Sequence, residues 1–94
     1  MKKLEFVATR EQYSELEGLA YWNANLSALK ERDPDNVHDR DRYGKAICLI
    51  FDRLDRQGVP YWVQNSALAA GEDWRQYLLS GVSKLLEKKG IVLA

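Results

Sequence analysis

The chain has 94 residues, 14 basic and 14 acidic side chains that give a net charge of zero, and one cysteine. This length supports one small core, so we expect a single domain over residues 1–94. The balanced charge excludes the strong overall field with which proteins gather nucleic acid or anionic membranes, and the lone cysteine excludes an internal disulfide.

The distribution of apolar residues argues against a membrane protein. No stretch approaches the ~20 apolar residues of a membrane span, and the first residues carry too many charges for a signal peptide. Small exported domains usually depend on disulfides, which this chain cannot form internally. The sequence therefore predicts a soluble protein in the cytoplasm, with no contact to membranes.

The N-terminal half predicts a short strand followed by two long helices. Residues 3–8 alternate loosely between apolar and polar side chains, as a strand does. Thr9 and Gln12 have the spacing of a capping box, and the helix that follows should end before Pro34. A second helix fits residues 37–57. The residues expected on the inner face of the first helix are Tyr13, Leu16, Leu19, Ala20, Asn23, Leu26 and Leu29. Those expected on the inner face of the second helix are Tyr43, Ala46, Ile47, Ile50 and Leu54, with Phe51 beside them.

The C-terminal half is less uniform. Residues 60–70 form either a short helix, with Pro60 in its first position and Gly71 as its cap, or an extended segment, and the pattern favours the helix. A final helix from Glu72 should end at Gly90, because acidic residues begin it and lysines end it. Its inner stripe reads Trp74, Leu78, Gly81 or Val82, and Leu85. Residues 91–93 are apolar and suited to pair with residues 3–8.

These elements predict a mainly α fold. We expect a small antiparallel helical bundle of three long helices and one short one, whose terminal segments form a short β-ribbon. The residues expected to share its core are Ile47, Ile50, Leu54, Leu78 and Leu85.

Two segments of the sequence resemble each other. Residues 18–29 match residues 58–68 when Leu26 is treated as an insertion. This internal similarity could come from duplication of a helical hairpin or from coincidence. One inserted residue rotates a helix face by about 100°, which favours coincidence.

Few residues could support catalysis or bind a metal. His38 is the only histidine, and its mixed-charge surroundings favour a solvated turn over a metal site, which needs several such ligands. Cys48 stands between Ile47 and Leu49, which predicts a thiol in or near the core. Phosphate-binding loops and nucleophile motifs are absent from the sequence. We therefore expect no catalytic residue, metal or cofactor, which favours a protein that is not an enzyme.

One enzymatic hypothesis ranks third. Glu11 and Glu15 share one helix face and Asp52 and Asp55 another, and paired carboxylates can hold Mg²⁺ inside a helical bundle. Arginines beside the aspartates, and the capping turn around Glu11, place these carboxylates on the outer surface instead.

A dimeric nucleic-acid-binding regulator is the second hypothesis. A helix, the turn at residues 57–60 and another helix have the outline of a helix-turn-helix. Residues 57–74 contain no lysine or arginine, although phosphate contacts supply much of the affinity for DNA. The helix at residues 60–70 is thus poorly suited to bind nucleic acid. The hypothesis therefore depends on basic residues of the preceding helix, at residues 37–57. They are Arg40, Arg42, Lys45, Arg53 and Arg56.

The aromatic residues carry the first hypothesis, a non-catalytic protein-binding module that acts as an adaptor, regulator or inhibitor. Two Tyr-Trp pairs occur, and adjacent helical positions point about 100° apart, so both rings of a pair are rarely buried together. Such residues are frequent in binding hot spots. The partner is an unknown protein, and a homodimer is also expected for so short a chain. The candidate contact residues are Tyr21, Trp22, Tyr61, Trp62, Gln64 and Asn65.

Overall fold

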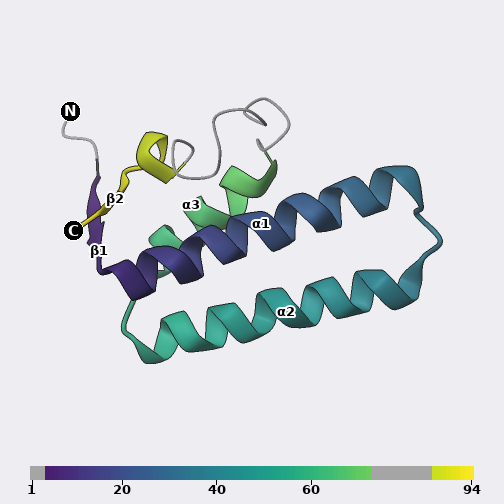
Figure 1. Ribbon diagram of the computed structural model, residues 1–94, viewed down its shortest axis with the longest axis horizontal. Coiled ribbons are helices and arrows are strands. Elements are labelled where there is room, and N and C mark those ends of the chain that lie inside the picture. The colour runs from purple at the N-terminus through teal and green to yellow at the C-terminus, as the bar shows by residue number, and fades with distance from the viewer. Residues whose placement is uncertain (1–3, 73–85) are drawn as a thin grey trace.

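The computed structural model describes residues 4–72 and 86–94 and shows a mainly helical fold with a pair of terminal strands (Figure 1). Helix α1 is central, because it packs against both α2 and α3. This arrangement confirms the predicted fold class. In chain order the elements are β1 (Phe6–Ala8), α1 (Arg10–Arg32), α2 (Val37–Arg56), α3 (Tyr61–Glu72) and β2 (Ile91–Leu93).

Helix α1 begins at the predicted capping box. The Thr9 hydroxyl accepts a hydrogen bond from the Gln12 backbone N–H at 3.2 Å, and the Gln12 side chain accepts one from the Thr9 N–H at 3.0 Å. The helix continues without a break through Gly18 and ends before Pro34, as predicted. Its buried residues are Tyr13, Leu16, Leu19, Ala20, Asn23 and Leu29, which is the predicted inner face except for the half-buried Leu26.

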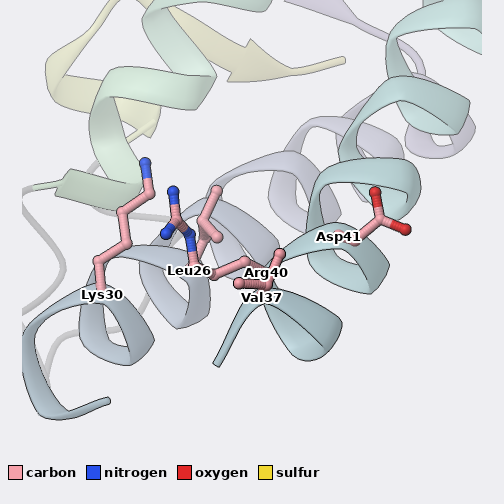
Figure 2. A pocket seen from close by; sticks show the side chains of 5 residues that line it. All are labelled: Leu26, Lys30, Val37, Arg40 and Asp41. Atoms are coloured by element: carbon pink, nitrogen blue, oxygen red, sulfur yellow. The ribbon is translucent and has the colours of Figure 1, made fainter. Parts of the chain in front are cut away.

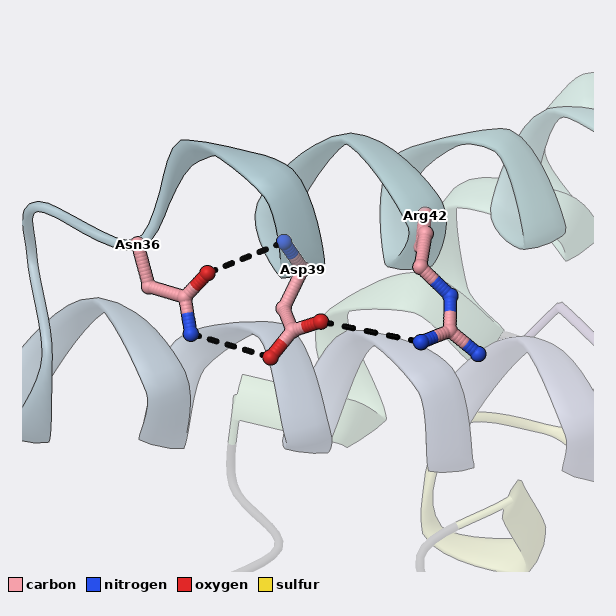
Figure 3. A network of polar contacts seen from close by, with 3 residues as sticks. All are labelled: Asn36, Asp39 and Arg42. Atoms are coloured by element: carbon pink, nitrogen blue, oxygen red, sulfur yellow. Dashed lines mark hydrogen bonds and ion pairs between the residues drawn. The ribbon is translucent and has the colours of Figure 1, made fainter.

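Helix α2 runs back beside α1 and forms a hairpin with it (Figure 1). Asn36 caps its first turn, since its side-chain oxygen accepts from the Asp39 N–H at 3.1 Å and its amide donates to the Asp39 carboxylate at 2.9 Å (Figure 3). Gly58 follows the helix with φ +75°, a conformation that favours glycine. The predicted core residues Ile47, Ile50 and Leu54 are buried, whereas Leu78 and Leu85 lie outside the described residues.

Helix α3 settles the ambiguous segment in favour of a helix, but the predicted cap at Gly71 is wrong. The helix continues to Glu72, and Gly71 is buried inside it. A Cβ at Gly71 would lie 2.9 Å from the Cβ of Asn23 and would collide with the Ala20 carbonyl oxygen. The Asn23 amide also donates to the Leu68 carbonyl at 2.7 Å. Glycine is needed here because α1 and α3 approach so closely.

The two strands pair in parallel, with Phe6 opposite Ile91. Parallel strands need a long crossover, which the intervening helices supply. Gly90 stands at the entry to β2 with φ +87°, and a Cβ there would collide with the Leu4 carbonyl oxygen. The pairing of the terminal segments is therefore as predicted. The final predicted helix lies mostly outside the described residues, which include only its end, helical at 86–88.

One apolar cluster joins all these elements. It contains Leu16 and Leu19 from α1, Ile50 and Leu54 from α2, and Val63 from α3, together with residues of the strands and connections such as Ile91 of β2. Leu86, which the predicted stripe of the last helix omitted, is fully buried in it. None of the described helices is both long and apolar enough to cross a membrane.

The internal similarity of the sequence does not correspond to equivalent places in the fold. Gly18 lies in the middle of α1. Gly58, its counterpart, lies in the connection between α2 and α3 with a left-handed backbone. The two segments thus begin in different structures, as coincidence would predict.

Candidate functional site

The two side chains singled out for catalysis lie on the surface. His38 is exposed in the first turn of α2. Cys48 is also exposed, so its predicted place in the core is wrong. Successive helical residues point about 100° apart, and an apolar run along the sequence therefore does not stay on the buried face that Ile47 and Ile50 share. In residues 4–72 and 86–94, no group of three or more His, Cys, Asp or Glu residues could hold a metal ion.

The carboxylates of the enzymatic hypothesis have structural partners instead. Asp52 pairs with Arg56 at 3.0 Å on the exposed side of α2. Asp55 accepts from the amide of Gln64 at 2.9 Å. Glu15 pairs with Arg53 at 2.9 Å and thereby ties α1 to α2, whereas Glu11 is exposed in the capping turn. Three of the four carboxylates are therefore engaged by side chains of the protein and do not converge on a cation site.

Most of the basic residues of the nucleic-acid hypothesis are neutralised by neighbouring acids. All are exposed, but four of the five are held in ion pairs. These pairs are Arg42 with Asp39 at 3.7 Å, Lys45 with Asp41 at 3.0 Å, Arg53 with Glu15 at 2.9 Å, and Arg56 with Asp52 at 3.0 Å. The remaining one, Arg40, donates to the Pro34 carbonyl at 3.2 Å. A face with this balance of charge has little attraction for phosphates.

The candidate residues of α3 are divided between the surface and the interior. Tyr61 and Asn65 are exposed, and Trp62 is half-buried against the core. Gln64 is fully buried, and its amide donates to Asp55 and to the Val59 carbonyl, both at 2.9 Å. Its oxygen has no hydrogen-bond partner among the described residues. Gln64 therefore joins α3 to the end of α2 and is not available to a partner.

The other aromatic pair belongs to a cluster of three rings. Tyr21 is 50% exposed and packs edge-on against Trp22, with ring centroids 5.6 Å apart. Trp22 in turn packs on Tyr43 of α2 at 5.5 Å. No ring contact joins Tyr61 or Trp62 to these rings in the described part of the chain. The structure thus brings only one of the two predicted pairs into a larger aromatic surface.

An open hollow of about 340 Å³ lies one helical turn beyond these rings, where α1 and α2 approach their connection (Figure 2). Leu26 is four residues beyond Trp22 on α1, so the two side chains lie on the same side of that helix. Arg40 is three residues before Tyr43 on α2, and these two likewise share one side of α2. We call the three rings and the hollow together the hairpin face. The hollow is lined by Leu26 and Lys30 of α1 and by Val37, Arg40 and Asp41 of α2.

The basic residues of the hollow are not paired with acidic residues in the described part of the chain, in contrast to the other basic residues of α2 considered above. Asp41 is paired with Lys45, outside the hollow, at 3.0 Å. Lys30 has no ion pair or hydrogen bond among the described residues, and Arg40 has only the Pro34 carbonyl. In Figure 2 the cationic ends of Lys30 and Arg40 point to the same side of the hairpin, while the Asp41 carboxylate points away from them. The hollow therefore combines an apolar floor with two cations that no carboxylate neutralises.

The net charge does not indicate this hollow, but the spacing of acidic and basic residues along the helices does. Lys45 and Arg56 each have an aspartate four residues earlier, which predicts an ion pair on the helix. Lys30 and Arg40 have no acid four residues away on either side. The sequence did not indicate Val37 as a site residue, because it is the first residue of α2 and lies outside the apolar stripe of that helix. In the structure its side chain is 67% exposed.

Comparison with known proteins gives no further guide to this face. The chain matches no protein-family model, no curated protein and no solved structure. Its function must therefore be inferred from the side chains themselves.

Proposed function

We propose that this domain is a non-catalytic protein-binding module, an adaptor, regulator or inhibitor that contacts its partner through the hairpin face. Large aromatic side chains that are partly exposed supply much of the binding energy in protein interfaces. The hairpin face has such side chains, and the hollow within it can receive a side chain from a partner.

The observation that carries this proposal is the uncovered apolar surface of the hairpin. Between Tyr21 and Ala46 the only buried apolar side chain is Leu29. Tyr21 is 50% exposed and Val37 is 67% exposed, although both are large enough to contribute to a core. Apolar residues that continue beyond a core in this way are typical of binding surfaces.

The exposed ring of α3 is a weaker candidate. Tyr61 is 69% exposed, but it belongs to no ring cluster among the described residues, and Gln64 on the same helix is buried. Single exposed apolar residues are common on protein surfaces and need no explanation. We therefore centre the proposal on Tyr21, Trp22 and the hollow.

The proposal also includes a reducing compartment, the cytoplasm, and self-association. An exposed free thiol such as Cys48 persists in reducing surroundings and is oxidised readily elsewhere. A second copy of the chain could contact the exposed ring of Tyr21 without filling the hollow. Light scattering coupled to gel filtration measures whether the wild-type chain is a dimer and whether Tyr21→Ser makes it a monomer.

Photo-crosslinking in native lysate tests the proposed surface directly. A photoreactive phenylalanine analogue is placed at Tyr21 or Val37, and in control variants at Tyr61 or Leu49, which are both more exposed than Tyr21 but lie elsewhere. We expect a reproducible protein adduct at Tyr21 and Val37 and a much lower yield at the controls. Equal yields at all positions, or no protein adduct at any of them, would contradict the proposed surface.

A further inference from the structure

We infer that the hollow of the hairpin face holds an acidic peptide segment, in which an aliphatic side chain lies next to a carboxylate. This inference rests on the proposed protein-binding function and names the chemistry of the partner. It follows from the composition of the hollow, whose floor and rim require different groups.

The apolar part of the hollow requires an apolar group from the ligand. Leu26 is half-buried and packs against the main core cluster, so it is fixed in place. Val37 stands opposite on α2 and leaves most of its surface to water. Covering both with an aliphatic side chain would remove their apolar area from water, which favours binding.

The charged part of the hollow requires a carboxylate. Lys30 and Arg40 come from different helices and reach the same side of the hairpin (Figure 2). Arg40 uses Nη1 for the Pro34 carbonyl, which leaves donors of its guanidinium free for a further partner. A carboxylate between the two cations would make charge-assisted hydrogen bonds that neither makes with the protein.

The same composition disfavours a nucleic acid. A nucleic acid is held by a row of cations along its phosphates, and the hollow offers only Lys30 and Arg40. Arg42 and Lys45, the cations that would extend the contact along α2, are already paired with acids. A single carboxylate beside an apolar side chain uses both halves of the hollow and needs no further cation.

The size of the hollow limits the ligand to a short segment. Its volume of about 340 Å³ is near the lower end of the range of ligand pockets, roughly 300–1,000 Å³. It is also widely open to solvent. One or two side chains of an extended peptide fit such a space, and the main chain would remain at the surface.

Fluorescence anisotropy with labelled peptides tests the inference on the whole chain. The probe is a short peptide of alternating glutamate and leucine, and the matched peptides replace either all glutamates by glutamine or all leucines by alanine. At ~50 mM salt, where exposed charges are only partly screened, we expect each replacement to weaken binding about tenfold or more. Duplex DNA of mixed sequence is the competing probe and should not displace the peptide.

Variants of the protein assign the binding to the hollow. Lys30→Gln combined with Arg40→Gln should weaken binding of the glutamate-leucine peptide about tenfold, and Val37→Ser should weaken it severalfold. These three side chains are mostly in solvent, and thermal melting verifies that the variants fold. Arg56→Gln is the control, since it removes one exposed cation of the same helix far from the hollow.

The outcomes separate this inference from the proposed function. Absence of binding, equal binding of the glutamine peptide, an undiminished affinity in the Lys30→Gln, Arg40→Gln variant, or displacement by DNA would each overturn the acidic-peptide inference. The proposed function would survive if the crosslinked adduct at Tyr21 persisted in that same variant. If Tyr21 gave no adduct in wild-type protein, the proposed function itself would fail.

Discussion

The two ends of the central helix are covered very differently. Helix α1 has 23 residues and α3 has 12, which correspond to lengths of about 35 Å and 18 Å. Helix α3 can therefore cover only about half of α1. It lies along the N-terminal half (Figure 1), and its C-terminal residues reach Ala20 and Asn23 in the middle of α1. We call this half, with the strands and the end of α2, the packed end. The other half of α1 continues beside α2 as the hairpin.

The difference teaches where stability and recognition are expected in this fold. At the packed end, side chains of α1, α2 and α3 such as Leu16, Leu54 and Val63 are fully buried in one cluster. In the hairpin, Trp22 and Leu26 are only partly buried, and Lys30 and Arg40 have no carboxylate partner among the described residues. Substitutions should therefore change stability strongly at the packed end and weakly in the hairpin, where they should change binding.

The largest effect should come from removing a core side chain at the packed end. Leu54→Ala removes a fully buried leucine and should lower the free energy of unfolding by about 2–5 kcal/mol. Leu49→Ala, on the same helix but 59% exposed, should change it by less than about 0.5 kcal/mol. Urea denaturation measures both. Similar losses in the two variants would mean that the burial of α2 has been assigned to the wrong face.

A smaller loss is expected at the half-buried tryptophan of α3. Trp62→Ala should lower the free energy of unfolding by about 2–3 kcal/mol, below the ~3–5 kcal/mol of a fully buried aromatic residue. Tyr61→Ala is the adjacent control, and its exposed ring should contribute little. If thermal melting showed no loss in Trp62→Ala, a binding role for α3 would regain support.

The two regions should respond with opposite signs to the same substitution of a helical glycine. Gly71→Ala forces a Cβ against Ala20 and Asn23, and overpacking of this kind costs about 1–3 kcal/mol. A Cβ at Gly44, in the hairpin, meets nothing within 4 Å. Gly44→Ala should therefore stabilise the protein by about 0.5–1 kcal/mol through helix propensity. Melting curves of the two variants that shifted in the same direction would contradict the close contact of α1 with α3.

The smallest effect concerns the ion pair between α1 and α2. Glu15 and Arg53 are 2.9 Å apart and partly exposed, so a double-mutant cycle with Glu15→Gln and Arg53→Gln should give a coupling of about 0.2–1 kcal/mol. The coupling should decrease at high salt, because exposed charges are screened. A coupling that is unchanged at ~1 M salt would indicate a pair more deeply buried than this structure has it.

The predictable part of this fold is the part that local chemistry controls. Thr9 and Gln12 begin α1, Asn36 caps α2, and Gly58 and Gly90 stop the elements before them. Each of these signals acts through hydrogen bonds or backbone angles within one turn, so neighbouring residues are sufficient to recognise it. Of the candidate binding site, the sequence indicated Tyr21 and Trp22 as partner residues.

Other features depend on contacts between distant residues, and sequence patterns did not indicate them. Cys48 was expected in the core and Gly71 at a helix end, because each has several plausible roles in an isolated helix. The structure decided between these roles by placing α1 against two helices at once. It also decided that Gln64 turns inward to Asp55.

The sequence by itself determined α1 and α2, their ends and the pairing of the terminal strands. Only the tertiary structure decided which helix sides stay uncovered, because the helical repeat leaves several neighbouring faces almost equally apolar. The hollow shows this most clearly, since Lys30 and Arg40 lie on separate helices and line the same hollow only when the hairpin forms. Whether a charge is neutralised depends on which side chains surround it in space, and neighbours along the chain are only some of these.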